Sequence, residues 1–115
     1  MPRYMLVAYD DPQALADVSA DEMQSIIERY MTWTRTIAEG GQLVSGEKLV
    51  EGRGRVVSRK SGALNVTDGP YTEAREVIGG VWIIRTDSEQ EALEIAASCP
   101  HSDMARLGFY EVDEV

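Results

Sequence analysis

The chain has 115 residues, of which 43% are hydrophobic, and 11 basic against 20 acidic side chains give a formal net charge of −9. This length predicts a single domain, residues 1–115, and the apolar content excludes a disordered chain. Clustered cations are needed to bind phosphate, so the acidic balance argues against direct nucleic-acid binding. The apolar runs are too short for a membrane span, which needs about 20 residues.

The first predicted strand covers residues 3–9 and carries apolar residues on both faces, which indicates that both faces are covered. Two aspartates follow it, and the pattern lacks the features of a signal peptide, so a cytoplasmic protein is expected. Ser19 and Glu22 fit a capping box that begins a helix, and Gly40-Gly41 ends the helix.

Three strands are expected next, at residues 42–49, 54–60 and 63–68, with the last two joined as a hairpin. The run from Lys48 to Lys60 holds five cations and one carboxylate, Glu51, which gives it a local charge of +4. A solvated hairpin face and a surface for an anionic ligand or an acidic partner are both compatible with this run.

Residues 68–84 read DGPYTEAREVIGGVWII and form the most detailed stretch of the chain. Asp68-Gly69-Pro70 predicts a tight reversal. The strand that follows, at about 76–86, is too apolar for a half-exposed strand. Gly79 and Gly80 inside it indicate a bulge, a bend or a close approach of another backbone.

A second helix is expected after a cap at Asp87 or Ser88 and should stop at Pro100, and a last strand covers residues 107–113. The lone cysteine, Cys99, is read as a small buried hydrophobe or as a nucleophile, and it cannot form an intramolecular disulfide. His101 and Asp103 are either a solvated loop pair or a base held by a carboxylate.

The motif DGP-aromatic-x-E-x-R-E at residues 68–76 resembles the signature of the YCII-related proteins of the DGPF type, whose DGPF motif reads DGPY here. The opening strand, residues 41–49 and Tyr110-Glu111-Val112 fit the same family. Asp113-Glu114 stand where the family commonly has Arg-Pro, which reverses a charge. The His–Asp dyad of some YCII-related enzymes is absent from residues 10–18, so their dehydrochlorinase-type chemistry is not implied.

The element order reads as β-α-β-β-α-β with the central strands taken as one meandering unit, which predicts an α+β, ferredoxin-like sandwich with helices on one sheet face. The other sheet face remains apolar, and a symmetric homodimer would bury it. The family resemblance implies the same assembly, a dimeric α+β barrel.

Clustered carboxylates raise one another's pKa in a half-buried cleft, so Asp68 and Glu76 are candidates for cofactor-free acid–base catalysis. In the structural alternative, Asp68 accepts backbone hydrogen bonds in its turn, Glu73 pairs with Arg75 on the surface, and Glu76 caps the strand end. Side chains of the same region and the chain end are candidate ligand contacts: Glu73, Arg75, Tyr71, Trp82 and Glu111. The aromatic residues suit a pocket wall or the core, and the core is the favoured interpretation. No cofactor is expected, and no metal site, because His/Cys pairs at ligand spacing are absent from the sequence.

Two functions are therefore compatible with the sequence. The first is the binding of a small organic molecule in an acidic and aromatic cleft, with or without turnover. The second, which the resemblance implies, is a non-catalytic accessory or regulatory module associated with an extracytoplasmic-function sigma factor.

Overall fold

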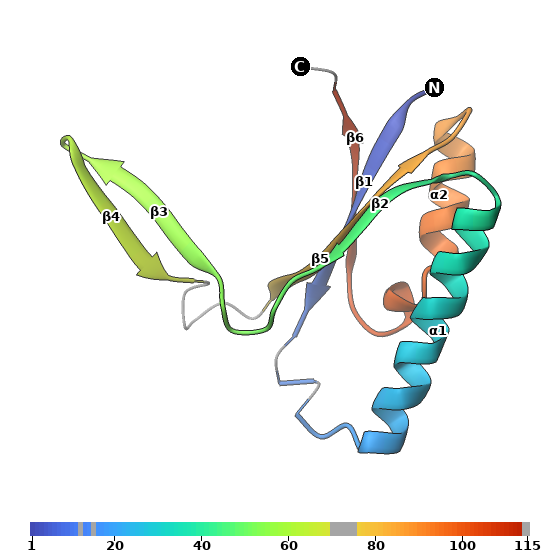
Figure 1. Ribbon diagram of the computed structural model, residues 1–115, viewed down its shortest axis with the longest axis horizontal. Helices are drawn as coiled ribbons and strands as arrows, with labels where there is room; N and C mark the ends of the chain where they lie inside the picture. The colour runs from blue at the N-terminus through green and yellow to red at the C-terminus, as the bar shows by residue number, and fades with distance from the viewer. Residues whose placement is uncertain (12, 15, 70–75, 114–115) are drawn as a thin grey trace.

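The computed structural model describes residues 1–115 except 12, 15, 70–75 and 114–115. Its elements follow one another along the chain as β1 (Arg3–Asp10), α1 (Ala20–Glu39), β2 (Leu43–Lys48), β3 (Arg55–Lys60), β4 (Ala63–Asp68), β5 (Val77–Arg85), α2 (Glu89–Ser98), the short 3-10 helix η1 (Pro100–Asp103) and β6 (Leu107–Val112) (Figure 1). The predicted α+β class is confirmed.

Four strands form one antiparallel sheet in the order β2-β5-β1-β6, and α1 and α2 lie on the same face of it (Figure 1). This arrangement of two helices on an antiparallel sheet is consistent with a ferredoxin-like fold. The interpretation of the central strands as one meandering unit is wrong. β3 and β4 pair only with each other and form a separate two-stranded sheet, which follows β2 and precedes β5 along the chain.

Both helices begin at the serine that the sequence indicates. The Ser19 Oγ accepts a hydrogen bond from the Glu22 amide at 3.1 Å, and the Ser88 Oγ accepts one from the Glu91 amide at 3.2 Å. Each bond satisfies an amide that the helix itself leaves unpaired. Of the two predicted caps for α2, Ser88 is therefore the one used.

The core lies between the sheet and the two helices. Its buried residues come from β1, α1, β5, α2 and the junction between α2 and η1, and they are Tyr4, Leu6, Trp33, Ile37, Ile84, Ala92, Ala96 and Cys99. Burial raises the pKa of the Cys99 thiol to about 11. A thiol with so high a pKa is a poor nucleophile at neutral pH, which favours the interpretation of Cys99 as a buried hydrophobe.

Gly79 and Gly80 meet two different neighbours. The register between β1 and β5 shifts between Ala8 and Tyr9, opposite Gly79. A Cβ atom at Gly79 would clash with a carboxylate oxygen of Asp10, and one at Gly80 would lie 3.0 Å from the backbone oxygen of Glu47. The predicted bulge and close backbone approach are both confirmed.

Replacing Gly80 with valine is expected to lower the free energy of unfolding by about 1–3 kcal/mol, because β2 must move away from the new side chain. Urea unfolding of wild type and variant measures this loss. Gly79→Ala is the matched comparison: its nearest crowding atoms belong to the Asp10 carboxylate, so its cost should fall in an Asp10→Ala background. An unchanged melting temperature for Gly80→Val would show that the close approach is unimportant.

The face of the sheet opposite the helices has an apolar centre and is called the open face. Its centre consists of two cross-strand pairs of β1 and β5, Met5 with Ile83 and Val7 with Val81. Within the part of the chain that the structure describes, the helices cover the other face only (Figure 1). Val7 is 6% exposed and the other three side chains are half-buried, and an apolar centre of this kind on a sheet face without helices favours contact with a further layer. None of the described helices is both long and apolar enough to cross a membrane.

Candidate functional site

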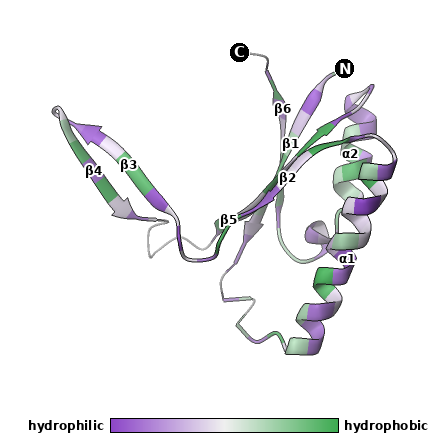
Figure 2. Cartoon of the chain, in the orientation of Figure 1, coloured by the Kyte–Doolittle hydropathy of each residue, from purple (hydrophilic) through white to green (hydrophobic). Residues whose placement is uncertain are grey.

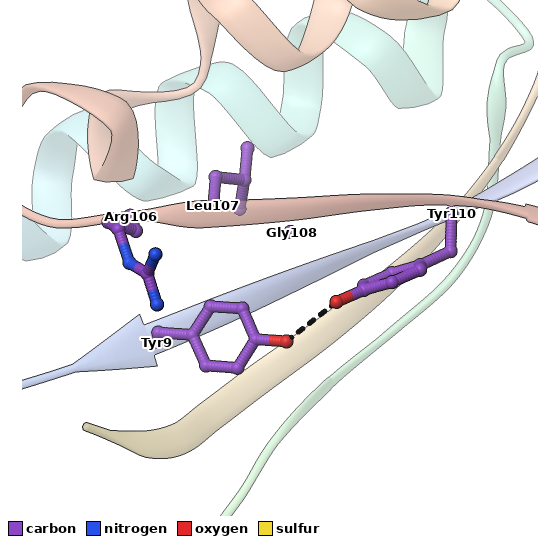
Figure 3. Close-up of a pocket in the computed structure, with 5 residues that line it drawn as sticks. All are labelled: Tyr9, Arg106, Leu107, Gly108 and Tyr110. Carbon is purple, nitrogen blue, oxygen red and sulfur yellow. Dashed lines mark hydrogen bonds between the residues drawn. The ribbon is translucent and has the colours of Figure 1, made fainter.

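Two tyrosines lie side by side at one end of the open face. Tyr9 comes from the end of β1 and Tyr110 from β6, and their hydroxyl oxygens are 2.9 Å apart (Figure 3). A Cβ atom at Gly108 would lie 2.8 Å from the Tyr110 ring and 2.9 Å from the Tyr9 ring. Only a residue without a side chain therefore lets both rings lie flat over β6.

Arg106 borders the tyrosine pair and is held by Glu76. Its Nε donates to Glu76 Oε2 at 2.9 Å and its Nη2 donates to Oε1, which makes a bidentate ion pair. The guanidinium carbon lies 5.8 Å from the centre of the Tyr9 ring, within the range of a cation–π contact. An open pocket of about 220 Å³ results, lined by Tyr9, Arg106, Leu107, Gly108 and Tyr110 (Figure 3). We call it the tyrosine pocket.

The tyrosine pocket offers hydrogen-bond donors to a ligand oxygen. The hydrogen bond to Tyr110, together with desolvation, raises the pKa of Tyr9, so the Tyr9 hydroxyl keeps its proton at neutral pH. One hydroxyl of the pair donates to the other, and the accepting hydroxyl keeps its own proton free for a ligand. Arg106 has five N–H donors, of which Glu76 occupies two, so further donors remain.

Glu76 is a carboxylate partner and not a proton donor. The hydrogen bonds from Arg106 lower the pKa of Glu76 from its ordinary value of 4.5, although partial desolvation opposes them. At neutral pH the group is therefore charged, and its lowered basicity makes it a weak general base. The geometry indicates that Glu76 fixes the direction of the guanidinium.

Glu76 should stabilise the fold only while it is ionised. Its pKa is lower in the folded than in the unfolded chain, so its contribution is present above pH 4.5 and is lost as the pH falls through the folded pKa. We expect Glu76→Gln to melt below wild type at about pH 7, and the difference in melting temperature to shrink as the pH falls below 4.5. Thermal unfolding followed by circular dichroism across this pH range measures the difference. A difference in melting temperature that does not change with pH would contradict the ion pair.

The structure places the other predicted site residues apart. Asp68 ends β4, with its side chain 93% exposed and an oxygen 3.4 Å from Arg55 Nε. Asp68 and Glu76 thus have different partners, Arg55 and Arg106, respectively. Glu73, Arg75 and Tyr71 lie outside the described residues. Of the site residues predicted from the sequence and described here, only Glu76 borders the tyrosine pocket.

Trp82 and Glu111 lie on the helix side of the sheet, away from the tyrosine pocket. The Trp82 ring meets Trp33 edge-on at 5.2 Å between centroids and stacks with Tyr30 at 6.2 Å. Glu111 is exposed and pairs in register with Tyr4, whose side chain belongs to the core. This placement favours the core interpretation of Trp82 over that of a pocket wall.

His101 is buried, with 3% of its surface exposed, so the prediction of a solvated loop histidine is wrong. Its Nδ1 lies 2.6 Å from the Tyr30 hydroxyl and its Nε2 lies 2.8 Å from the Tyr9 carbonyl oxygen. A carbonyl only accepts, so Nε2 donates to it, and a neutral ring then accepts the Tyr30 proton at Nδ1. The predicted His–Asp pair is also wrong, because Asp103 bonds Arg29 at 2.8 Å. His101 thereby anchors the backbone of Tyr9.

All five residues that line the pocket escaped the sequence analysis as site residues. Tyr9 lies in the predicted first strand, residues 3–9, and Arg106 belongs to no motif. Strand alternation from the buried Tyr4 would have placed Tyr9 on the face away from the helices. The described residues include no cluster of three or more His, Cys, Asp or Glu side chains that could hold a metal ion.

Comparison with known proteins assigns the chain to a family. The model of the YCII-related domain matches residues 2–115. An uncharacterised protein of Rhizobium meliloti (strain 1021) is 28% identical over 110 residues, which cover 95% of this chain and 88% of that protein. The chain belongs to the YCII-related domain family, as the sequence motif indicates.

Proposed function

We propose that this protein binds a small organic acid or phenol in the tyrosine pocket, without a cofactor. The arrangement of Tyr9 and Tyr110 over Gly108, beside the Glu76-held guanidinium of Arg106, is the observation that carries the proposal. Preorganised donors of this kind suit a carboxylate or phenolate oxygen, because little side-chain entropy is lost on binding. The aromatic rings and Leu107 suit the apolar body of such a ligand.

A second copy of the chain is proposed to cover the open face. The four apolar side chains at its centre come from neighbouring strands, and the tyrosine pocket lies at the end of the same face. Two open faces packed against each other would form a symmetric homodimer with a dimeric α+β barrel. Such a dimer would enclose the ligand between two sheets and strengthen its hydrogen bonds by excluding water.

Ligand binding is better supported than acid–base catalysis, for which the two predicted carboxylates would be needed. Asp68 is exposed on the hairpin, and its carboxylate pairs with Arg55. Glu76 is charged and weakly basic because of Arg106. A cofactor-free reaction in this pocket would have to use Glu76 as a base against that pKa shift.

A screen of small organic acids and phenols by thermal shift tests the proposal, because a ligand of the folded state raises the melting temperature. The expected result is a ligand that stabilises wild type and loses its effect with Tyr110→Phe and Arg106→Lys. Asp68→Asn is the matched control and should keep the full shift, since Asp68 lies on the hairpin. Equal shifts in all four proteins would place the ligand elsewhere.

An accessory module for an extracytoplasmic-function sigma factor is the second candidate. It is favoured by the pairing of both predicted carboxylates with arginines, Asp68 with Arg55 and Glu76 with Arg106, which leaves neither free for chemistry. In this case no acid or phenol would shift the melting temperature, and the protein would bind a purified sigma factor in a pull-down. A ligand shift that depends on Tyr110 would favour the first candidate instead.

A further inference from the structure

The hairpin of β3 and β4 has no support from the rest of the described chain. Its two strands pair with each other over residues 55–60 and 63–68, and all of these residues except Ser58 are exposed. An isolated two-stranded hairpin is marginally stable in water. A hairpin of this length therefore calls for a packing surface that another molecule supplies.

One face of this hairpin is apolar. The register pairs Val57 with Val66 and sets Leu64 beside them on the same face, and these side chains are 63%, 48% and 58% exposed, respectively. Figure 2 shows these hydrophobic segments on both strands. The opposite face carries mainly polar side chains, among them Ser58 and Asn65. The apolar face, Val57, Leu64 and Val66, is the candidate contact surface.

The position of the hairpin matches a partner that sits on the open face. The hairpin stands on the side of the sheet away from α1 and α2 (Figure 1). The radius of gyration is 16.2 Å, whereas a compact chain of this length has about 13 Å. A body docked on the open face would lie on the same side as the hairpin.

The charge of the hairpin indicates which kind of partner would dock on the open face. The hairpin, residues 55–68, holds Arg55, Arg59 and Lys60 against Asp68, so it carries +2 and the rest of the chain carries −11. Another copy of the same chain is therefore an electrostatically complementary partner. A symmetric pair would let each hairpin reach the acidic body of the other copy.

We infer that the β3–β4 hairpin is an arm that clasps a second copy of this chain, with Val57, Leu64 and Val66 packed against the partner. The inference rests on the homodimer proposed above and adds a second contact region to it. The arm contributes an apolar contact in its centre, flanked on the same face by Arg59 on one side and by the Arg55–Asp68 ion pair on the other. The hairpin would then be ordered by the dimer that it clasps.

Sedimentation equilibrium of Val66→Asp against Asn65→Asp tests the arm. The two variants add the same charge at neighbouring positions on opposite hairpin faces. A carboxylate buried without a partner is costly, so Val66→Asp should raise the dimer dissociation constant about tenfold or more, while Asn65→Asp should behave as wild type. Equal effects of the two variants would overturn the arm.

Amide hydrogen exchange of the wild type provides a second, independent test in case Val66→Asp unfolds the hairpin. Amides of residues 55–68 should exchange more slowly as the protein concentration rises through the dimer dissociation constant. If the protein dimerises but this exchange does not depend on concentration, the hairpin is not a dimer contact, although the proposed homodimer itself is not contradicted. A monomer at all concentrations would overturn both.

Discussion

Replacing Trp82 with alanine is expected to lower the free energy of unfolding by about 3 kcal/mol or more. The indole packs against Trp33 and Tyr30 on the helix side of the sheet and lies across Gly46, where an added Cβ would be 2.8 Å from it. Truncation would therefore leave a cavity that spans the interface of β2, β5 and α1. Urea unfolding monitored by far-ultraviolet circular dichroism gives the loss.

Leu93→Ala is the matched control, because Leu93 lies on α2 with its side chain largely exposed. Its cost should stay below about 1 kcal/mol. The Trp82→Ala loss should also be the same at two protein concentrations, since the indole faces the chain's own helices. A loss that disappears at low concentration would place Trp82 at a subunit interface instead.

Val81→Asp is expected to convert the protein from dimer to monomer. Val81 lies at the centre of the open face beside Val7, so the proposed dimer would bury the new carboxylate without a partner. A cost of several kcal/mol corresponds to a dissociation constant about 100-fold higher or more. Light scattering should give twice the chain mass of 12.7 kDa for wild type and the single mass for the variant.

Leu93→Asp adds the same charge at an exposed leucine of α2, on the other side of the molecule, and should leave the dimer intact. A Val81→Asp protein that sediments as wild type would contradict the facing-sheet assembly. A wild type that is monomeric at micromolar concentration would contradict it more simply.

The local signals of the sequence predicted the elements well. Ser19 and Ser88 begin the two helices because a serine hydroxyl satisfies a free amide of the first turn. The glycine pair of β5 marked both a register shift and a close approach to β2. These features depend on residues close together in the chain, where spacing alone carries the information.

The site depends on pairs that are distant in the chain, so its geometry was harder to predict. Tyr9 and Tyr110 are 101 positions apart, and Glu76 and Arg106 are 30 apart. Their contacts follow from which strands are neighbours and in which register, and neither is visible in local periodicity. The motif at 68–76 also drew attention to six residues, 70–75, that lie outside the described part of the chain.

His101 illustrates the same limit for a single residue. Its short polar segment after Pro100 is typical of a solvated loop, whereas η1 packs the ring against Tyr30 of α1. Desolvation by burial is the main cause that raises the pKa of Tyr30, which keeps its proton available to the imidazole. Only tertiary contact with β1 and α1 turns this histidine into an anchor for Tyr9.

An NMR titration of protein carrying ¹³C-labelled tyrosine tests the central claim most directly. The chain has five tyrosines, so Tyr→Phe variants can assign every ring signal. The acid or phenol with the largest thermal shift should move the signals of Tyr9 and Tyr110, whose hydroxyls meet in the pocket, and leave those of Tyr4 and Tyr30 in place. Saturating shifts of Tyr9 and Tyr110 alone are the result we predict. Binding that moves Tyr4 or Tyr30 and leaves the tyrosine pair unchanged would contradict the proposed site.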